Sequence, residues 1–174
     1  MINQLEIAEL AMPTCKVCKG TGIIRGAKPC GCVLREVCRQ CLEHSSACAA
    51  GVLGSEGSKN RPADVSYVYR KFFADFYRCT QRELSGLRLD LFECFFILGN
   101  NPGLICKRFR ISRDKFFSEI SLIEEALGAA FCKARPYPLF PLNEYFVARF
   151  ARYSALSPAA PRRVRAQKAA AAAA

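Results

Sequence analysis

The sequence predicts a mainly α-helical protein, a helical bundle containing a helix-turn-helix and preceded by a small cysteine-rich module. Three observations lead to this prediction. Seven cysteines lie between residues 15 and 48. Apolar residues beyond residue 63 recur at helical intervals. Capping residues, glycines and prolines then divide that region into separate helices. The chain of 174 residues, 51% of them hydrophobic, is long enough to bury one core and carry a small added module.

The cysteine-rich module begins with Cys15 and Cys18, which are two residues apart and followed by Gly20 and Gly22. Thiolates at this spacing can reach one tetrahedral zinc ion at about 2.3 Å. The glycines allow the backbone to curl around the ion at positive φ. We therefore expect a zinc-binding module over residues 1–50. The candidate ligands are Cys15, Cys18, Cys30, Cys32, Cys38 and Cys41, with His44 and Cys48 as further candidates.

The ligand pairing stays open at this point. The leading set is Cys15, Cys18, Cys30 and Cys32, which leaves Cys38, Cys41 and His44 or Cys48 for a second ion. Alternatively, the first pair combines with Cys38 and Cys41. Either one or two Zn²⁺ ions are expected as cofactors. A disulfide framework suits secreted chains, and the first twelve residues lack the basic stretch of a signal peptide. We therefore expect a cytoplasmic protein with reduced cysteines.

Two function classes are disfavoured by what the sequence lacks. The longest apolar run, at residues 91–98, is interrupted by Glu93 and is much shorter than a membrane span, so no membrane partner is expected. His44 is the only histidine, and no His-x-Glu motif accompanies the cysteines. We therefore expect no enzyme. The four scattered cysteines are expected to pack as small apolar residues: Cys79, Cys94, Cys106 and Cys132.

A Gly- and Ser-rich linker is expected at residues 51–62, followed by a helical domain at 63–154. Its first helix should run to about residue 79 after a cap at Asp64 or Ser66. A second should span residues 81–98, with Leu84, Leu87, Leu91, Cys94 and Leu98 on one face. Gly99 ends it. Three prolines at residues 136–141 require extended chain, and Asn143 can cap a last helix.

The centre of the domain predicts a helix-turn-helix. Asn101 can cap a short helix with Pro102 at its first position, and residues 110–112 then form a turn. Ser112 caps a second helix over residues 113–130. We expect the inward-facing residues of that helix to be Phe116, Phe117, Ile120, Ile123 and Leu127. This layout is that of DNA-binding helix pairs, although an ordinary helical hairpin remains the alternative.

The charge pattern favours a polyanionic partner. The formal net charge is +11, and the last 24 residues contain five Lys and Arg and no acidic residue. We expect residues 155–174 to be a disordered basic tail and nucleic acid, DNA rather than RNA, to be the partner. A simple solvated surface is the alternative. The candidate nucleic-acid contacts are Lys107, Arg108, Arg110, Arg113, Lys115, Arg162, Arg163 and Arg165.

Three resemblances extend this interpretation. Residues 87–127 resemble the helix-turn-helix of the fourth region of bacterial sigma factors. Residues 15–22, CKVCKGTG, are similar to one repeat of the cysteine-rich module of DnaJ-type chaperones. The same element resembles that of the zinc-containing late antiterminators of lambdoid phages, the Q proteins. That last resemblance implies zinc ligation by Cys15 and Cys18, a bacterial or phage-infected cell, and RNA polymerase as a further partner.

The function expected from these features is that of a zinc-containing, DNA-binding transcription regulator, with antitermination alongside RNA polymerase implied by the resemblance. Two alternatives remain open. One is an RNA-binding or ribosome-associated zinc protein that uses the same basic surfaces. The other is a protein-interaction module in which zinc only folds the N-terminal region.

Overall fold

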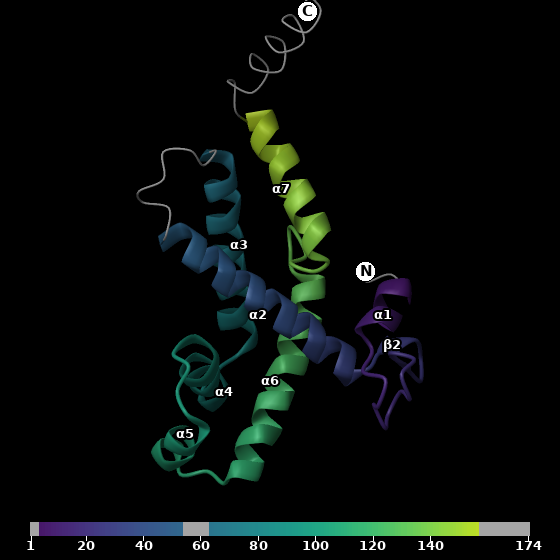
Figure 1. The fold of residues 1–174 in the computed structure, drawn as a ribbon, viewed down its shortest axis with the longest axis vertical. Coiled ribbons are helices and arrows are strands. Elements are labelled where there is room, and N and C mark those ends of the chain that lie inside the picture. Colours follow the sequence, from purple (N-terminus) through teal and green to yellow (C-terminus); the bar gives the residue numbers. More distant parts are fainter. Residues whose placement is uncertain (1–3, 54–62, 157–174) are drawn as a thin grey trace, which may run out of the picture.

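The computed structural model describes the backbone of residues 4–53 and 63–156. It confirms a mainly α-helical fold with a small N-terminal sheet (Figure 1). The helices in chain order are α1 Gln4–Leu10, α2 Gly31–Leu53, α3 Ala63–Glu83, α4 Leu87–Phe92, the π-helical turn η1 Glu93–Ile97, α5 Pro102–Phe109, α6 Arg113–Lys133 and α7 Leu142–Leu156. The two strands are β1 Ile23–Ile24 and β2 Lys28–Pro29, which pair antiparallel. Within these described ranges, no helix is long and apolar enough to cross a membrane.

Helix α6 is the axis of the bundle (Figure 1). Helix α2 crosses it obliquely, α3 lies alongside, and α4 and α5 sit beside its N-terminal half. The N-terminal module lies at the start of α2, on the opposite side of α6 from α5. Helix α2 therefore connects the cysteine-rich region to the rest of the fold.

The crossing of α2 and α6 depends on a close approach of their backbones. A Cβ atom at Gly128 would overlap the carbonyl oxygen of Leu34, so glycine allows the helices to meet at this distance. Two ion pairs flank the crossing. The Arg39 guanidinium donates from Nε and Nη2 to the two oxygens of Glu124, at 3.0 and 3.2 Å. Arg35 lies 3.5 Å from Glu125. These contacts fix α2 against α6.

Aromatic and aliphatic side chains from several helices form the main core. Phe76 of α3 lies between Phe92 and Phe131, with ring centroids 6.4 and 5.1 Å away. Phe116, Ile123 and Leu127 of α6 are fully buried. A second, smaller core holds the N-terminal module together, and its buried members are Ile7, Ala11, Cys18, Cys30, Cys32 and Val33.

The structure differs from the expected domain division. Residues 31–50, assigned from sequence to the N-terminal module, form most of α2, and buried Val37 lies in the same core as α3 and α6. The expected linker at 51–62 begins inside α2, and residues 54–62 lie outside the described residues. The expected tail begins inside α7, and residues 157–174 also lie outside them.

The expected single helix over residues 81–98 is also wrong. Helix α3 continues to Glu83, and α4 begins only after Gly86, whose φ of 53° marks a break between the two helices. Residues Glu93–Ile97 then form a π-helical turn instead of a regular helical end. The predicted end at Gly99 is confirmed, since its φ is 64°.

The capping predictions for α5 and α6 are confirmed. The Asn101 side chain accepts a hydrogen bond from the Gly103 amide at 2.8 Å, and Pro102 is the first residue of α5. The Ser112 hydroxyl accepts from the Lys115 amide at 3.2 Å. Between the helices, Arg110 takes a left-handed conformation with φ 53° and ends α5.

Candidate metal centre and basic helix pair

The first cysteine pair lies on a tight turn. The Lys19 amide donates to the Cys15 carbonyl at 2.8 Å, and the Thr21 amide and hydroxyl donate to the Cys18 carbonyl at 3.0 and 2.7 Å. The backbone then passes through positive φ at Lys19, Gly20 and Gly22. A Cβ atom at Gly22 would lie 2.6 Å from the Ile7 carbonyl oxygen, so this glycine also allows α1 to pack on the turn. The positive φ predicted at Gly20 and Gly22 is confirmed.

The second pair lies where a hairpin meets a helix. Strands β1 and β2 pair Ile23 with Pro29 and Ile24 with Lys28, which returns the chain towards the first pair. The Cys30 amide donates to the Gly22 carbonyl at 2.8 Å. Helix α2 begins at Gly31, so Cys30 lies just before the helix and Cys32 in its first turn.

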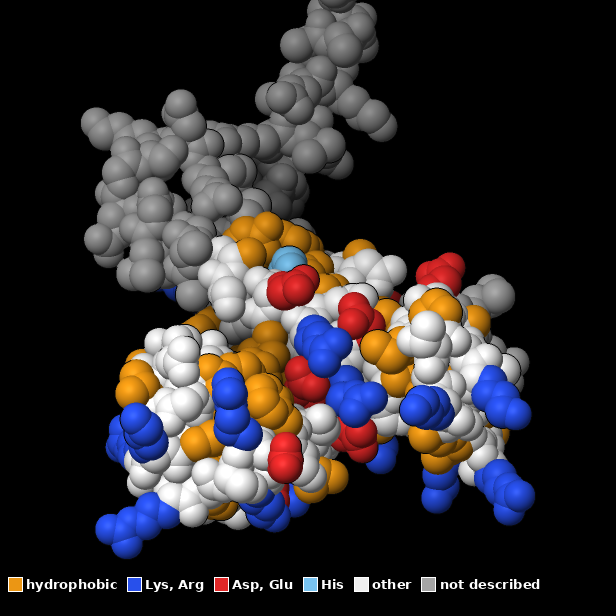
Figure 2. Space-filling view, turned by 60° about the horizontal axis from the view of Figure 1, so that its bottom comes forward, with side chains coloured by type: hydrophobic (Ala, Val, Ile, Leu, Met, Phe, Trp, Pro, Cys, Tyr) orange, Lys and Arg blue, Asp and Glu red, His pale blue; other side chains and the backbone are white. Residues whose placement is uncertain are grey.

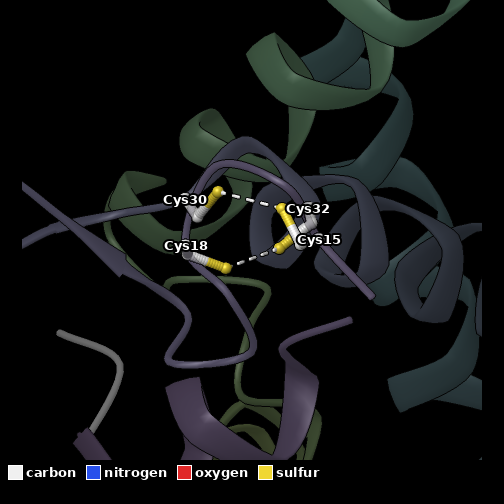
Figure 3. Close-up of side chains that lie close together, drawn as sticks. All are labelled: Cys15, Cys18, Cys30 and Cys32. Carbon is white, nitrogen blue, oxygen red and sulfur yellow. Dashed lines mark hydrogen bonds between the residues drawn. The ribbon is translucent and has the colours of Figure 1, made fainter. Parts of the chain in front are cut away.

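The four cysteines converge on one point (Figure 3). All four sulfur atoms lie within 4.8 Å of one another. Two of the separations are 3.8 Å, between Cys15 and Cys30, and 3.6 Å, between Cys18 and Cys32. Four thiolates at about 2.3 Å from a tetrahedral ion would be about 3.8 Å apart. The leading ligand set therefore has the geometry of one tetrahedral metal site.

The electrostatics of the cluster differ between its members. The Cys18 and Val17 backbone amides stabilise the thiolate of Cys15 and lower its pKa to about 6. Burial raises the pKa of Cys32 to about 12, and it also raises the pKa of Cys30. Four thiolates this close repel one another. A bound cation would offset that repulsion and favour deprotonation of all four. A site of four cysteine sulfurs suits zinc or iron.

The second predicted metal site is not formed among the described residues. Cys38, Cys41 and Cys48 point into the main core from α2, with 0, 0 and 2% of each residue exposed. Burial raises the pKa of Cys38 and Cys41, and it raises the pKa of Cys48 to about 11. Among the described residues, these three thiols do not belong to the group of side chains that lie close enough together to share a metal ion. They pack as small apolar residues instead.

His44 lies with aromatic rings rather than with the cysteine cluster. Its ring contacts Phe72 and Phe146 edge-on, with centroids 5.1 and 4.8 Å away. Its Nε2 atom is buried and makes no hydrogen bond. Burial lowers the pKa of His44, so the neutral ring is favoured. The prediction of His44 as a zinc ligand is wrong for the described cluster.

The predicted nucleic-acid residues of α5 and α6 all lie on the surface. Lys107, Arg108, Arg110, Arg113 and Lys115 are exposed. Lys107, Arg110 and Arg113 form no ion pair with any residue that the structure describes. Lys115 differs, because its ammonium lies 2.6 Å from Glu119. The tail residues Arg162, Arg163 and Arg165 lie outside the described residues.

Three of the four acidic residues of α6 form ion pairs, whereas Asp114 is exposed and forms none with a described residue. Glu119 binds both Lys115 and Arg88, the latter at 2.9 Å, and hydrogen bonds from these two residues lower its pKa. Glu124 and Glu125 hold Arg39 and Arg35 of α2. The three glutamates of α6 are therefore neutralised by cations of this chain, and Asp114 is the acidic side chain left beside Arg113.

One prediction on α6 is wrong and bears on its surface chemistry. Phe117, expected in the core, is 49% exposed, whereas its neighbour Phe116 is fully buried against Phe95. Phe117 thus lies on the outer surface of α6, one helical turn after Arg113. In a helical projection Phe116 lies within the apolar stripe of Ile120, Ile123 and Leu127, whereas Phe117 lies about 100° from Phe116, beside that stripe.

Comparisons with known proteins give no relative for this chain. No family model, no curated protein and no solved structure matches it.

Proposed function

We propose that this chain is a zinc-containing, DNA-binding transcription regulator whose α5 and α6 helices contact duplex DNA. The observation that carries the proposal is the α5–α6 unit, residues 102–118. Two capped helices are joined by three residues, with unpaired cations on the first helix, on the turn and at the start of the second. A DNA-binding helix pair uses this arrangement to place its second helix in the major groove.

Different residues of the α5–α6 unit are suited to different chemical groups of the duplex. Arg113, in the first turn of α6, is suited to a bidentate contact with a guanine edge. Lys107 and Arg110 are suited to phosphate contacts, which position the protein without reading sequence. The exposed Phe117 ring can contact a thymine methyl group. Lys115 is held by Glu119, so we assign it a smaller part.

Zinc is the metal we propose for the four-cysteine site. Four sulfur ligands with near-tetrahedral separations are typical of a structural zinc site that has no open position. Such a site holds the loop and the start of α2 in one conformation. In this proposal the metal serves folding, and DNA binding is the function.

Antitermination with RNA polymerase is the finer form of the proposal. It rests on the resemblance of residues 15–22 to the zinc element of phage late antiterminators. Exposed apolar side chains on α5 and just before it favour a protein partner as well: Ile97, Leu98 and Leu104 are 49, 65 and 64% exposed. Co-purification of RNA polymerase with the tagged full-length protein tests this form. Loss of that polymerase in the Leu98→Ser/Leu104→Ser variant, with DNA binding retained, would support it.

The DNA-binding proposal is tested by selecting duplexes from a random pool with the zinc-loaded protein and measuring affinity by fluorescence anisotropy. Arg113→Ala should weaken binding to the best duplex about 10- to 100-fold and relax its sequence preference. Lys107→Ala should weaken all duplexes alike and lower the salt slope by about 1. Lys133→Ala, at the far end of α6, is the matched control and should change neither.

Equal effects of Arg113→Ala and Lys107→Ala on selected and random duplexes would argue against groove reading. Tighter binding of structured RNA than of any duplex would favour the RNA-binding alternative. If Arg113→Glu leaves the output of a transcription reporter unchanged, the protein-interaction alternative is favoured.

A further inference from the structure

The loop that carries the four cysteines has a strongly basic surface. The cysteine loop, defined here as residues 12–32, contains four cations and no acidic residue. All four are exposed, and none forms an ion pair with a described residue. They are Lys16, Lys19, Arg25 and Lys28. The next two arginines along the chain, Arg35 and Arg39, are paired with glutamates of α6. The cations of the cysteine loop, unlike Arg35 and Arg39, are therefore not neutralised by a described acidic residue of this chain.

These cations gather at the tips of two adjacent turns. Lys16 lies between the first two cysteines and Lys19 follows the second, whereas Arg25 begins the hairpin turn and Lys28 begins β2. The two tips line one shallow groove, which is formed by Val17, Cys18, Lys19, Ile23, Ile24 and Arg25. Val17, 73% exposed, lies among these cations. A zinc ion with four thiolates carries a charge of about −2, so the loop stays positive when the metal is bound.

The cysteine loop and the α5–α6 unit are displayed on one face of the molecule. Figure 2 shows Lys and Arg side chains on both the lobe formed by α4, α5 and the start of α6 and the lobe formed by the cysteine loop. Acidic side chains lie mainly between the two lobes. The backbone contact of Gly128 with Leu34 and the Arg39–Glu124 pair fix α2 on α6, so they also fix the loop relative to Arg113.

We propose that the cysteine loop is a second nucleic-acid contact, which binds the phosphate backbone of the duplex whose groove α6 enters. This inference rests on the proposed DNA-binding function. Unpaired cations on a small loop suit phosphates, because each neutralised phosphate releases a condensed counterion. The apolar Val17 side chain suits the sugar edge beside those phosphates. A bound metal ion would thereby help the small N-terminal core to hold four cations in a fixed arrangement.

The experiment compares two triple variants of the full-length, zinc-loaded protein. The loop variant is Lys16→Gln/Arg25→Gln/Lys28→Gln, which leaves Lys19 in place because its φ is 52°. The control variant is Arg70→Gln/Lys71→Gln/Lys133→Gln, which removes the same charge from exposed positions outside both lobes. Metal content and far-ultraviolet circular dichroism confirm folding first. Affinity for a selected duplex is then measured at several salt concentrations between about 50 and 300 mM. The slope of log affinity against log salt concentration gives the number of phosphate contacts.

The loop variant should lower the salt slope by about 2 to 3, because each lost phosphate contact removes about 0.9. The control variant should leave the slope nearly unchanged. An unchanged slope in the loop variant, with Arg113→Ala still weakening binding, would overturn the inference and leave the proposed function standing. If the loop variant and the control variant lowered the salt slope equally, the effect would come from net charge and the inference would be overturned.

A different result would support the loop contact and contradict the α5–α6 proposal. If the loop variant abolished duplex binding while Arg113→Ala and Lys107→Ala had no effect, the loop contact would be supported and the α5–α6 proposal overturned. Loop-dependent binding to structured RNA, without binding to duplex DNA, would overturn the duplex as the occupant of this surface.

Discussion

Cys15 and Cys18 lie in a loop that turns at glycines, whereas Cys38 and Cys41, at the same separation in sequence, lie on one side of helix α2. In the loop, positive φ values at Gly20 and Gly22 bring the sulfurs towards Cys30 and Cys32. On the helix, residues three apart share a face, and this face is buried in an apolar core. Cysteine spacing therefore predicts a metal site only together with the backbone conformation around it.

The two cysteine regions also differ in what orders them. The small core around the cysteine loop has six buried members, three of which are candidate metal ligands. The α2 cysteines lie among fully buried aromatic rings from α3 and α6. We therefore expect the loop to depend on a bound metal ion and α2 to depend on packing. The four predictions below test this difference, from the largest expected effect to the smallest.

Replacing one cysteine in each region should separate a ligand from a core residue. We expect Cys18→Ala to lose the single bound metal ion, because a structural zinc contributes about 10–16 kcal/mol of apparent binding free energy that three ligands cannot retain. Cys38→Ala should keep one ion per chain. Metal analysis of both proteins, purified without added zinc, makes the comparison. Loss of metal in both variants would mean that the two regions form one site.

Chelation should unfold the cysteine loop and leave the bundle intact. The Thr21 and Cys30 amides, which are hydrogen-bonded within the loop, should exchange with solvent much faster after metal removal. The Ile123 amide, in the centre of α6, should keep its protection. Residue-resolved hydrogen exchange with and without chelator measures both. Equal loss of protection at Ile123 would contradict the division into a metal-dependent loop and a packing-dependent bundle.

A hydroxyl in place of a core thiol should destabilise the bundle without affecting the metal. Cys41→Ser should lower the free energy of unfolding by about 1–3 kcal/mol, because Cys41 has no exposed surface and its core surroundings are apolar. Urea denaturation measures this change, with Cys41→Ala as the matched control that introduces no polar group. A serine variant as stable as the alanine variant would show that this position is less apolar than described.

The smallest expected effect is a pH dependence from His44. Its pKa is lowered below 6.5 in the folded state by burial, so the unfolded chain takes up a proton first as pH falls. Stability from this residue is therefore present above pH 6.5 and is lost as the pH falls below it. His44→Leu should flatten the change in unfolding free energy between about pH 7.5 and 5.5.

The unaltered protein and His44→Leu are both measured in saturating zinc, so that release of the metal in acid affects the two proteins alike. An unchanged pH slope in His44→Leu would contradict burial as the cause. Loss of the metal ion in this variant would instead restore His44 as a ligand.

Local signals explain what the sequence could predict. The caps of α5 and α6 depend on Asn101, Pro102 and Ser112 and on amides within three residues of them, so they could be recognised without knowledge of the fold. The same is true of the glycine turn after Cys18. The convergence of Cys30 and Cys32 on that turn was the leading one of two pairings that the sequence left open, and the structure brings this set together.

Other features depended on contacts that are distant in sequence. Arg39 and Glu124 are 85 residues apart, and nothing local indicates their pairing. Helix α2 was not predicted because its cysteines were interpreted as metal ligands. Its apolar periodicity does indicate a helix, since Val33, Val37, Cys41 and Cys48 recur at helical intervals and are all buried. Phe117 was assigned to the core although helical periodicity with Ile120, Ile123 and Leu127 favours Phe116, and the contact of Phe116 with Phe95 agrees with that periodicity.

Gly128 has a consequence for how this sequence can change over time. Every other amino acid would place a Cβ atom on the carbonyl group of Leu34, and that carbonyl belongs to the backbone, so no rotamer change on α2 relieves the overlap. A saturation mutagenesis library should therefore tolerate no replacement at position 128, while the exposed position 122 on the same helix accepts many. An absent side chain is thus among the most constrained features of the chain.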